Sequence, residues 1–483
     1  MPANLAAETT GPLVQGTAPA RSLNGALAGL SLAMLLSSLD TSIANVALPA
    51  LAESFAAPFS EVQWVIVAYL LVITTTIVSV GRLGDVLGRR RLLLTGITLF
   101  TAASALCGVA PTLSLLIAAR AVQGLGGAIM MALTLALVGE TVPKEKTGSA
   151  MGLLGTMSAI GTSLGPSLGG VLIAGFGWPA IFLVNLPLGL LTWFLACHHL
   201  PADTPRPKTN RAGFDPLGTL LLAGTLAAYA LAMTLGHGRF GPLNATLLLV
   251  AVLGTGLFLL AELKAAAPLV RLTMFRDPVL SAGLATSALV ATVITTTLVV
   301  GPFYLSRALG LDAARVGLAL SVGPLVAAMT AAPAGRLADR FGAQRVMVAG
   351  LLGMAAGCGL LTLLPATLGV VGFLAPIVVV TAGYGLFQTA NNTVLMMNIR
   401  PNQRGVISGL LNLSRNLGRI TAASAMGAVF AFAAATTDFS TASPAAVATG
   451  LRASFAVAGV LLLLALALSV RSRADMLRAS SPS

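Results

Sequence analysis

Hydrophobic residues are arranged along this chain in long blocks separated by short polar segments. Each block holds about 20 residues, the length that an α-helix needs to cross about 30 Å of hydrocarbon. We therefore expect an all-α integral membrane protein. The blocks predict fourteen transmembrane helices, at residues 25–48, 62–80, 91–110, 113–138, 147–174, 180–199, 216–235, 243–263, 279–305, 316–335, 346–364, 370–397, 406–435 and 453–470.

The composition excludes a soluble enzyme. Hydrophobic residues make up 56% of the 483 residues and charged residues only 9%, against about 25% in soluble proteins. The cysteines Cys107, Cys197 and Cys358 have no paired spacing, and no histidine stands in a ligand motif. We expect no metal and no cofactor.

The basic residues define the expected orientation. The net charge is +13. With both termini on one side of the membrane, 21 Lys and Arg fall in segments on that side and four on the other. Cytosolic segments carry such an excess, so both termini are expected in the cytosol. Because the charges are spread over eight segments, nucleic-acid binding is not expected.

One loop motif occurs twice. The sequence GRLGDVLGRRR at 81–91 returns as GRLADRFGAQR at 335–345, each time after the second span of a set of six. This repeat predicts two six-helix bundles related by pseudo-two-fold symmetry, with two helices inserted between them, an arrangement typical of transporters. The expected divisions are a cytosolic tail at 1–24, the first bundle at 25–200, a linker with the inserted helices at 201–278, the second bundle at 279–470 and a second cytosolic tail at 471–483.

Three more motifs stand in order with this loop: LDTSIANVALP at 39–49, RAVQGLGG at 120–127 and GTSLGPSLGG at 161–170. Together they resemble the major facilitator superfamily, and specifically its fourteen-span drug:proton antiporter group. The resemblance covers the chain from residue 39 to about residue 470. It implies a proton-coupled efflux transporter that exports hydrophobic or amphipathic molecules by alternating access. One departure is Arg419, which stands where the group is expected to have a small residue.

Asp40 is the only acid well inside a predicted span. An ionised acid at the bilayer centre costs about 2.5–3.5 kcal/mol, which favours a functional group or a buried ion pair. Counting residues puts Asp40 about 23 Å from the inner face and Arg120 at a similar depth. Burial favours the protonated carboxyl group and a nearby cation favours the charged one. We expect the pair to couple proton movement to transport, with Asp40 as the negative site for substrate; a static pair that fixes helix packing is the alternative.

The resemblance also implies two mechanical elements. An inside latch would join the bundles, and the span at 147–174 would help to close the site, because its glycines recur every four residues and a proline bends its axis. Plain helix packing is the alternative for this span. The latch residues are Gly81, Asp85, Gly88, Arg89, Asp339 and Arg340, and those of the bent span are Gly161, Gly165, Pro166, Gly169 and Gly170.

Polar residues inside the spans are candidates for a substrate cavity, with structural interhelical hydrogen bonds as the alternative. Inside the membrane Arg120, Arg415 and Arg419 outnumber Asp40. Either these arginines bind carbonyl and structural groups away from the cavity, or the substrate carries negative charge. The cavity candidates are Asn45, Gln123, Gln388, Asn391, Asn392 and Arg415. Candidates for an adaptable apolar wall, with ordinary packing as an equal alternative, are Tyr69, Phe182, Tyr304, Tyr384 and the pairs Met130–Met131 and Met396–Met397.

The expected function is thus multidrug efflux in the cell membrane, with the export of one specific metabolite, such as an anion, as the alternative. A membrane-embedded enzyme is less favoured, because it would need a nucleophile with a base, or a metal cluster, inside the spans. A transport-dead sensor would need a signalling domain that the short tails do not supply. The expected partners are the lipid bilayer, a small-molecule substrate and protons, with the chain as a monomer.

Overall fold

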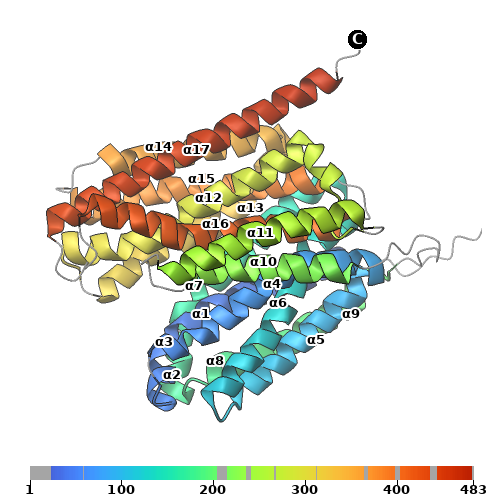
Figure 1. Ribbon diagram of the computed structural model, residues 1–483, viewed down its shortest axis with the longest axis horizontal. Helices are drawn as coiled ribbons and strands as arrows, with labels where there is room; N and C mark the ends of the chain where they lie inside the picture. Colours follow the sequence, from blue (N-terminus) through green and yellow to red (C-terminus); the bar gives the residue numbers. More distant parts are fainter. Residues whose placement is uncertain are drawn as a thin grey trace, which may run out of the picture.

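The computed structural model describes residues 23–480, except for 58, 204–214, 235–240, 266–267, 312, 364–367, 398–402 and 436–442. Within these residues the chain forms helices and no strand (Figure 1). The first group of long helices consists of α1 (Leu23–Val46), α4 (Trp64–Leu87), α5 (Arg89–Gly108), α6 (Leu113–Thr141), α7 (Thr147–Phe176) and α9 (Asn185–His199). The short helices α2 (Leu48–Ser54), α3 (Phe59–Val62) and α8 (Ala180–Leu183) lie at one end of this group.

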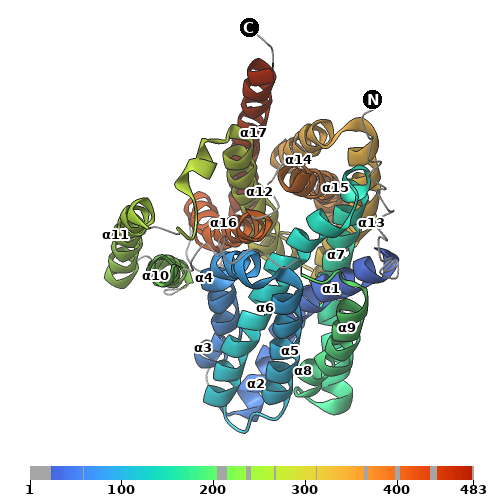
Figure 2. The same cartoon turned by 90° about the vertical axis from the view of Figure 1, so that its right-hand side faces the viewer.

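The second group consists of α12 (Pro278–Phe303), α13 (Ala313–Phe341), α14 (Ala343–Leu363), α15 (Gly369–Met397), α16 (Arg404–Ala433) and α17 (Pro444–Ser480). Figure 2 shows it above the first group, with α10 (Pro216–Thr234) and α11 (Pro242–Lys264) to one side. Helix α10 lies next to α4 and α16, and α11 packs on the outside of α10. We call the two groups the N-terminal and the C-terminal bundle. The expected all-α membrane protein with paired bundles is confirmed.

Twelve helices of the described chain are long and apolar enough to cross a membrane, and the bent α7 would be a thirteenth. Helix α16 is equally long but carries arginines at positions 404, 415 and 419. The fourteen predicted spans are consistent with these helices. Several helices run past the predicted apolar blocks; α4 reaches residue 87 and α13 reaches residue 341, because charged residues can continue a helix once it leaves the hydrocarbon.

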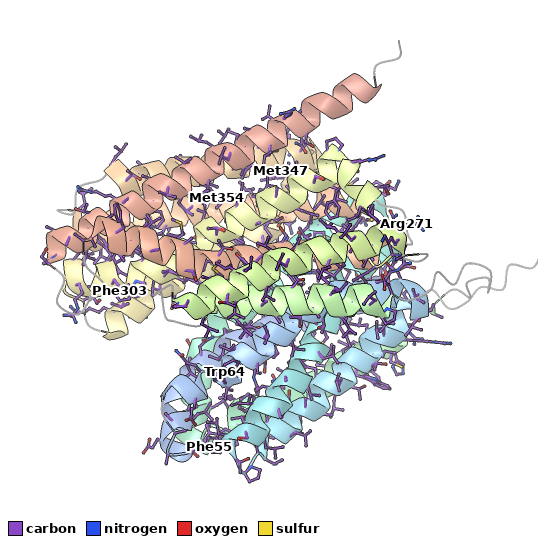
Figure 3. All side chains as sticks on the ribbon, viewed as in Figure 1. Phe55, Trp64, Arg271, Phe303, Met347 and Met354 are labelled. Carbon is purple, nitrogen blue, oxygen red and sulfur yellow. The ribbon has the colours of Figure 1, made fainter. Side chains whose placement is uncertain are left out.

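The ends of the bundles differ in charge. The repeated loops at 81–91 and 335–345 lie at one end, together with Arg271, and we call it the basic end. Figure 3 shows Phe55 and Phe303 at the opposite end. The bundles touch mainly along two helix pairs, α4 with α16 and α7 with α13, and also where α6 meets α16 and α7 meets α15.

Each bundle has its own apolar core. The first contains Tyr69 and Phe100 and the second contains Phe373 and Phe455, all four side chains being fully enclosed. The first core also extends across the interface to Ile407 on α16. The two bundles are therefore packed together through apolar contacts as well as through the polar contacts described below.

Candidate functional site

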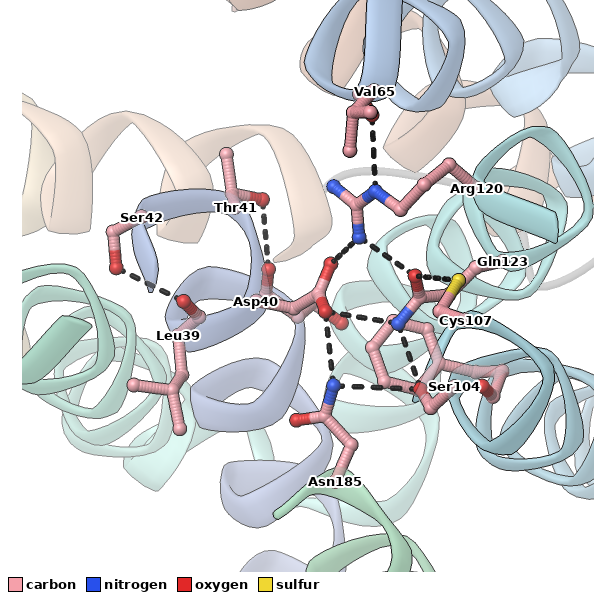
Figure 4. A network of polar contacts seen from close by, with 12 residues as sticks. Leu39, Asp40, Thr41, Ser42, Val65, Ser104, Cys107, Arg120, Gln123 and Asn185 are labelled. Carbon is pink, nitrogen blue, oxygen red and sulfur yellow. Dashed lines mark hydrogen bonds and ion pairs between the residues drawn. The ribbon is translucent and has the colours of Figure 1, made fainter. Parts of the chain in front are cut away.

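The Asp40 carboxylate lies at the centre of a buried polar network in the N-terminal bundle (Figure 4). Its Oδ2 accepts a hydrogen bond from Arg120 Nη1 at 2.6 Å, which forms an ion pair. Its Oδ1 accepts from Gln123 Nε2 and from Asn185 Nδ2, both at 2.9 Å. Both amide groups also donate to Ser104 Oγ. Asp40 therefore accepts three hydrogen bonds from side chains of two other helices.

Arg120 is held from several sides. Its Nε donates to the Val65 carbonyl oxygen at 3.1 Å, and its Nη1 also donates to Gln123 Oε1 at 2.6 Å. The guanidinium group lies over the ring of Tyr69, 4.1 Å from the centroid, and 5.6 Å from that of Phe182. A cation over an aromatic face is stabilised by the ring quadrupole. These contacts fix Arg120 without help from Asp40.

All partners of Asp40 come from the N-terminal bundle, and both Asp40 and Arg120 are 0% exposed. The similar depths in the membrane that residue counting gave for Asp40 and Arg120 agree with this ion pair. The expectation that Asp40 itself would be the negative site for substrate does not fit this conformation, because no part of the carboxylate is open to the space between the bundles. Gln123, Tyr69 and Phe182 are likewise enclosed in this network instead of lining a cavity. The coupling role of the pair stays a prediction.

Replacement of Gln123 by Leu should lower the stability of the protein. The substitution removes hydrogen bonds to Asp40, Arg120 and Ser104, and each buried polar group left unsatisfied costs about 1–3 kcal/mol. We expect the thermal unfolding midpoint in detergent, followed by tryptophan fluorescence, to fall by several degrees. Gln388→Leu is the matched control, since this half-buried side chain makes no hydrogen bond in the described structure. Equal midpoints for both variants would contradict the network's structural importance.

The first copy of the repeated loop joins the two bundles through Asp85. Asp85 Oδ1 accepts a hydrogen bond from the Gly405 N–H at 3.0 Å, and Oδ2 accepts from the Val406 N–H at 3.2 Å. These amides are at the start of α16, where helical N–H groups lack partners and the dipole favours an anion. Arg89 donates to Asp85 at 2.7 Å and to Glu140 at 2.5 Å. Asp85 therefore caps a helix of the opposite bundle.

The second copy repeats this arrangement in the other direction. Asp339 Oδ1 accepts from the Gly148 N–H at 2.9 Å, and Oδ2 accepts from the Ser149 N–H at 2.9 Å and from its hydroxyl at 2.5 Å. Gly148 and Ser149 stand in the first turn of α7. Each bundle thus sends one aspartate to a helix start in the other. Together we call these two contacts the latch.

The glycines of the loop permit this close approach. A Cβ atom at Gly81 would overlap the carbonyl oxygen of Gly405, and one at Gly335 would overlap that of Gly148. Gly88 has φ +105°, in the left-handed region that favours glycine, where the chain turns from α4 into α5. One predicted latch residue is wrongly placed: Arg340 is exposed and lies over the ring of Phe341, away from the latch contacts.

Helix α7 packs its glycine face against α1. Added Cβ atoms at Gly161, Gly165 and Gly169 would overlap atoms of residues 35–43 of α1. Gly170, predicted with them, faces open space. The parts of α7 before and after Pro166 differ in direction by 43°, as a missing N–H and a crowded ring would cause. The glycine face therefore provides packing within one bundle, and gating by α7 stays a prediction.

The remaining candidates divide between structural and open positions. Asn391 donates to Ser287 Oγ at 2.8 Å and to a carbonyl oxygen of α12, which ties two helices of the C-terminal bundle together. Asn392 accepts a hydrogen bond from buried Arg415. Asn45 is exposed and bonds to its own helix. The sequence did not single out Ser104 or Asn185, since small polar residues occur in many spans and only the rotation of each helix directs them to Asp40.

Paired helical bundles with a polar interface, latched at one end, define a membrane transporter. The chain matches the family model of the Major Facilitator Superfamily over residues 30–423. It belongs to this superfamily, and it is a transporter and not an enzyme.

Named relatives cover most of the chain. Riboflavin transporter RibZ of Clostridioides difficile is 32% identical over 80% of this chain and 84% of its own length. Multidrug resistance protein Stp of Mycobacterium tuberculosis is 32% identical over 83% of this chain and 74% of its own length. Multidrug efflux pump LfrA of Mycolicibacterium smegmatis is 30% identical over 84% of this chain and 80% of its own length.

Solved structures share the fold at low sequence identity. The human organic anion transporter MFSD10 has 17% identity and a TM-score of 0.67, and the match covers 92% of this chain and 99% of that chain. The proton:xylose symporter XylE also has 17% identity and a TM-score of 0.67, with 93% and 95% covered.

Proposed function

We propose that this protein is a proton-coupled antiporter of the cell membrane that exports hydrophobic or amphipathic small molecules by alternating access. The observation that carries the proposal is the buried Asp40–Arg120 pair, because an ionisable group in a span marks a proton or substrate pathway by default. Relatives named as multidrug transporters support the efflux of diverse molecules. The relative named as a riboflavin transporter supports the alternative, a transporter of one specific metabolite.

In this proposal the pair binds and releases a proton during the transport cycle. When Asp40 takes up a proton it loses its charge and its ion pair with Arg120, whereas Arg120 keeps its contacts with the Val65 carbonyl and the Tyr69 ring. The helices α1, α6 and α9, whose side chains meet at this carboxylate, can then shift relative to one another. Substrate does not touch Asp40; the proton acts through helix positions.

The basic end faces the cytosol in this proposal, as the excess of Lys and Arg requires. The latch then closes the cytosolic side. All cross-bundle hydrogen bonds among the described residues, those of Asp85, Asp339 and Asn412, lie in the halves of the helices nearer this end. In this proposal the latched structure corresponds to the outward-facing form of the cycle, from which substrate is released to the outside. The lipid bilayer, the substrate and protons are the partners, and the chain works as a monomer.

Transport in liposomes tests the proposal. Purified protein is reconstituted with a pH-sensitive dye in the lumen, and cationic and anionic amphipathic fluorophores are screened. We expect an imposed pH gradient to drive at least one fluorophore against its concentration gradient, with proton flow in the opposite direction. A proton ionophore should abolish this accumulation. Fluorophore movement that ignores the pH gradient in every case would exclude proton coupling.

A further inference from the structure

Two arginines stand in the middle of α16 without an acid. Arg415 is 9% exposed, and Asn392 Oδ1 on α15 is its one hydrogen-bond partner within the described ranges. Arg419, four residues on, is exposed. Tyr384 on α15 and Arg419 are the ionisable groups near enough to Arg415 to act on it electrostatically. The guanidinium groups are therefore neighbours that share no counter-ion from the described chain.

The contacts of α16 establish which way this pair faces. Asn412 donates to a carbonyl oxygen of α6 in the N-terminal bundle. Ser414 bonds to a carbonyl of α12, and Thr421 bonds to α10, which covers the outer side of α16. Successive side chains of an α-helix are 100° apart around its axis, so Arg419 points in a direction between those of Asn412 and Arg415. It is thus exposed on the side toward the N-terminal bundle, and not on the side covered by α10.

Among the residues that the structure describes, no acid forms an ion pair with either arginine. Asp40 is already paired with Arg120 in the other bundle, and Asp339 is bound to the start of α7. The acids that follow residue 278 all lie outside the predicted spans, at Asp312, Asp339, Asp438 and Asp475. Like charges four residues apart on a helix destabilise it, and a guanidinium group withdrawn from water needs an anion. A bound anion would remove both costs.

We propose that Arg415 and Arg419 bind the anionic group of the transported molecule, so that the substrates are organic acids with an apolar part. The planar guanidinium group matches a carboxylate with two parallel hydrogen bonds, which suits Arg better than Lys. Asn392 holds Arg415 in place, and Tyr384 can donate a further O–H to the same anion. This inference rests on the proposed function, because it assigns the substrate class of that transporter.

Binding of three probes with one fluorophore and different charge tests the inference. The probes are dansylglycine, an anion, dansylglycinamide, which is neutral, and dansylcadaverine, a cation; binding to detergent-purified protein is followed by dansyl emission. We expect the wild type to bind dansylglycine at least tenfold more tightly than either other probe. Arg419→Gln and Arg415→Gln should each lower dansylglycine affinity about tenfold and leave dansylglycinamide affinity within twofold, whereas Arg419→Lys should lose less than Arg419→Gln.

Arg452→Gln is the matched control, since Arg452 is an exposed arginine on α17 and should leave all three affinities unchanged. If Arg415→Gln does not fold, Arg419→Gln still tests the inference, because the Arg419 side chain is exposed and its replacement should not disturb folding. Tighter binding of dansylcadaverine than of dansylglycine, or an equal loss for the anionic and the neutral probe, would overturn the inference. The binding assay uses no pH gradient, so its result does not depend on whether transport in liposomes is coupled to protons. Likewise, a negative binding result would not affect the test of proton coupling.

Discussion

Asp40→Asn should abolish the accumulation of substrate driven by a pH gradient. Asparagine keeps the shape of the carboxyl group and some hydrogen bonds of the network, but it cannot bind or release a proton. We expect accumulation in liposomes to fall at least tenfold, while downhill movement of the same fluorophore continues. The measurement is the initial rate of uptake with and without an imposed gradient, at equal amounts of reconstituted protein.

Two further variants separate the charge of Asp40 from its place in the structure. Asp40→Glu retains an acid and should keep part of the coupling. Glu53→Gln removes an exposed acid from α2 and should leave transport unchanged. Asp40→Asn also leaves Arg120 without its anion, which can cost about 3–5 kcal/mol, so thermal unfolding of each variant is measured alongside. A folded Asp40→Asn that accumulates substrate as the wild type does would reduce the pair to a packing element.

Removal of both latch aspartates should open the basic end. In Asp85→Ala/Asp339→Ala each helix start loses its cap, and hydrogen bonds to a charged group contribute about 1.5–3 kcal/mol each. Ser408 on α16 is 0% exposed while the latch is closed, so a cysteine there reports opening. We expect Ser408→Cys to react with a water-soluble thiol reagent at least tenfold faster in the double variant, because about 1.4 kcal/mol corresponds to a tenfold change in population.

The labelling experiment needs a background without Cys197, which is half-buried, whereas Cys107 and Cys358 are buried. Glu145→Ala is the matched control: it removes an exposed acid from the same end of the molecule, next to the start of α7. In the Glu145→Ala variant, the cysteine of Ser408→Cys should react as slowly as it does when both latch aspartates are present. If the double variant also labels at this rate, the aspartate contacts do not hold the bundles together, and the remaining contacts, those of Asn412 and the apolar ones around Ile407, are sufficient.

The fold was predictable because the bilayer imposes a length on every apolar block, and the repeated loop revealed the pairing of the bundles. The Asp40–Arg120 contact followed from depth, since residue counting along two helices fixes height above the membrane face. Rotation about the helix axis is not fixed in this way, so the parts played by Ser104 and Asn185 were not foreseen. The two aspartates of the latch were foreseen, but their partners in the opposite bundle are mostly backbone amides, which have no side-chain signature in the sequence.

Because Asp85 and Asp339 bind mainly main-chain groups of the opposite bundle, few second-site substitutions can compensate for the loss of either aspartate. When two side chains of opposite charge meet, exchanging them can restore the lost attraction; a peptide N–H offers nothing to exchange. Revertants of a defective aspartate should therefore not map to residues 405, 406 or 148, which contribute only main-chain groups. They should instead carry substitutions, far from the original one, that destabilise the arrangement in which the basic end is open.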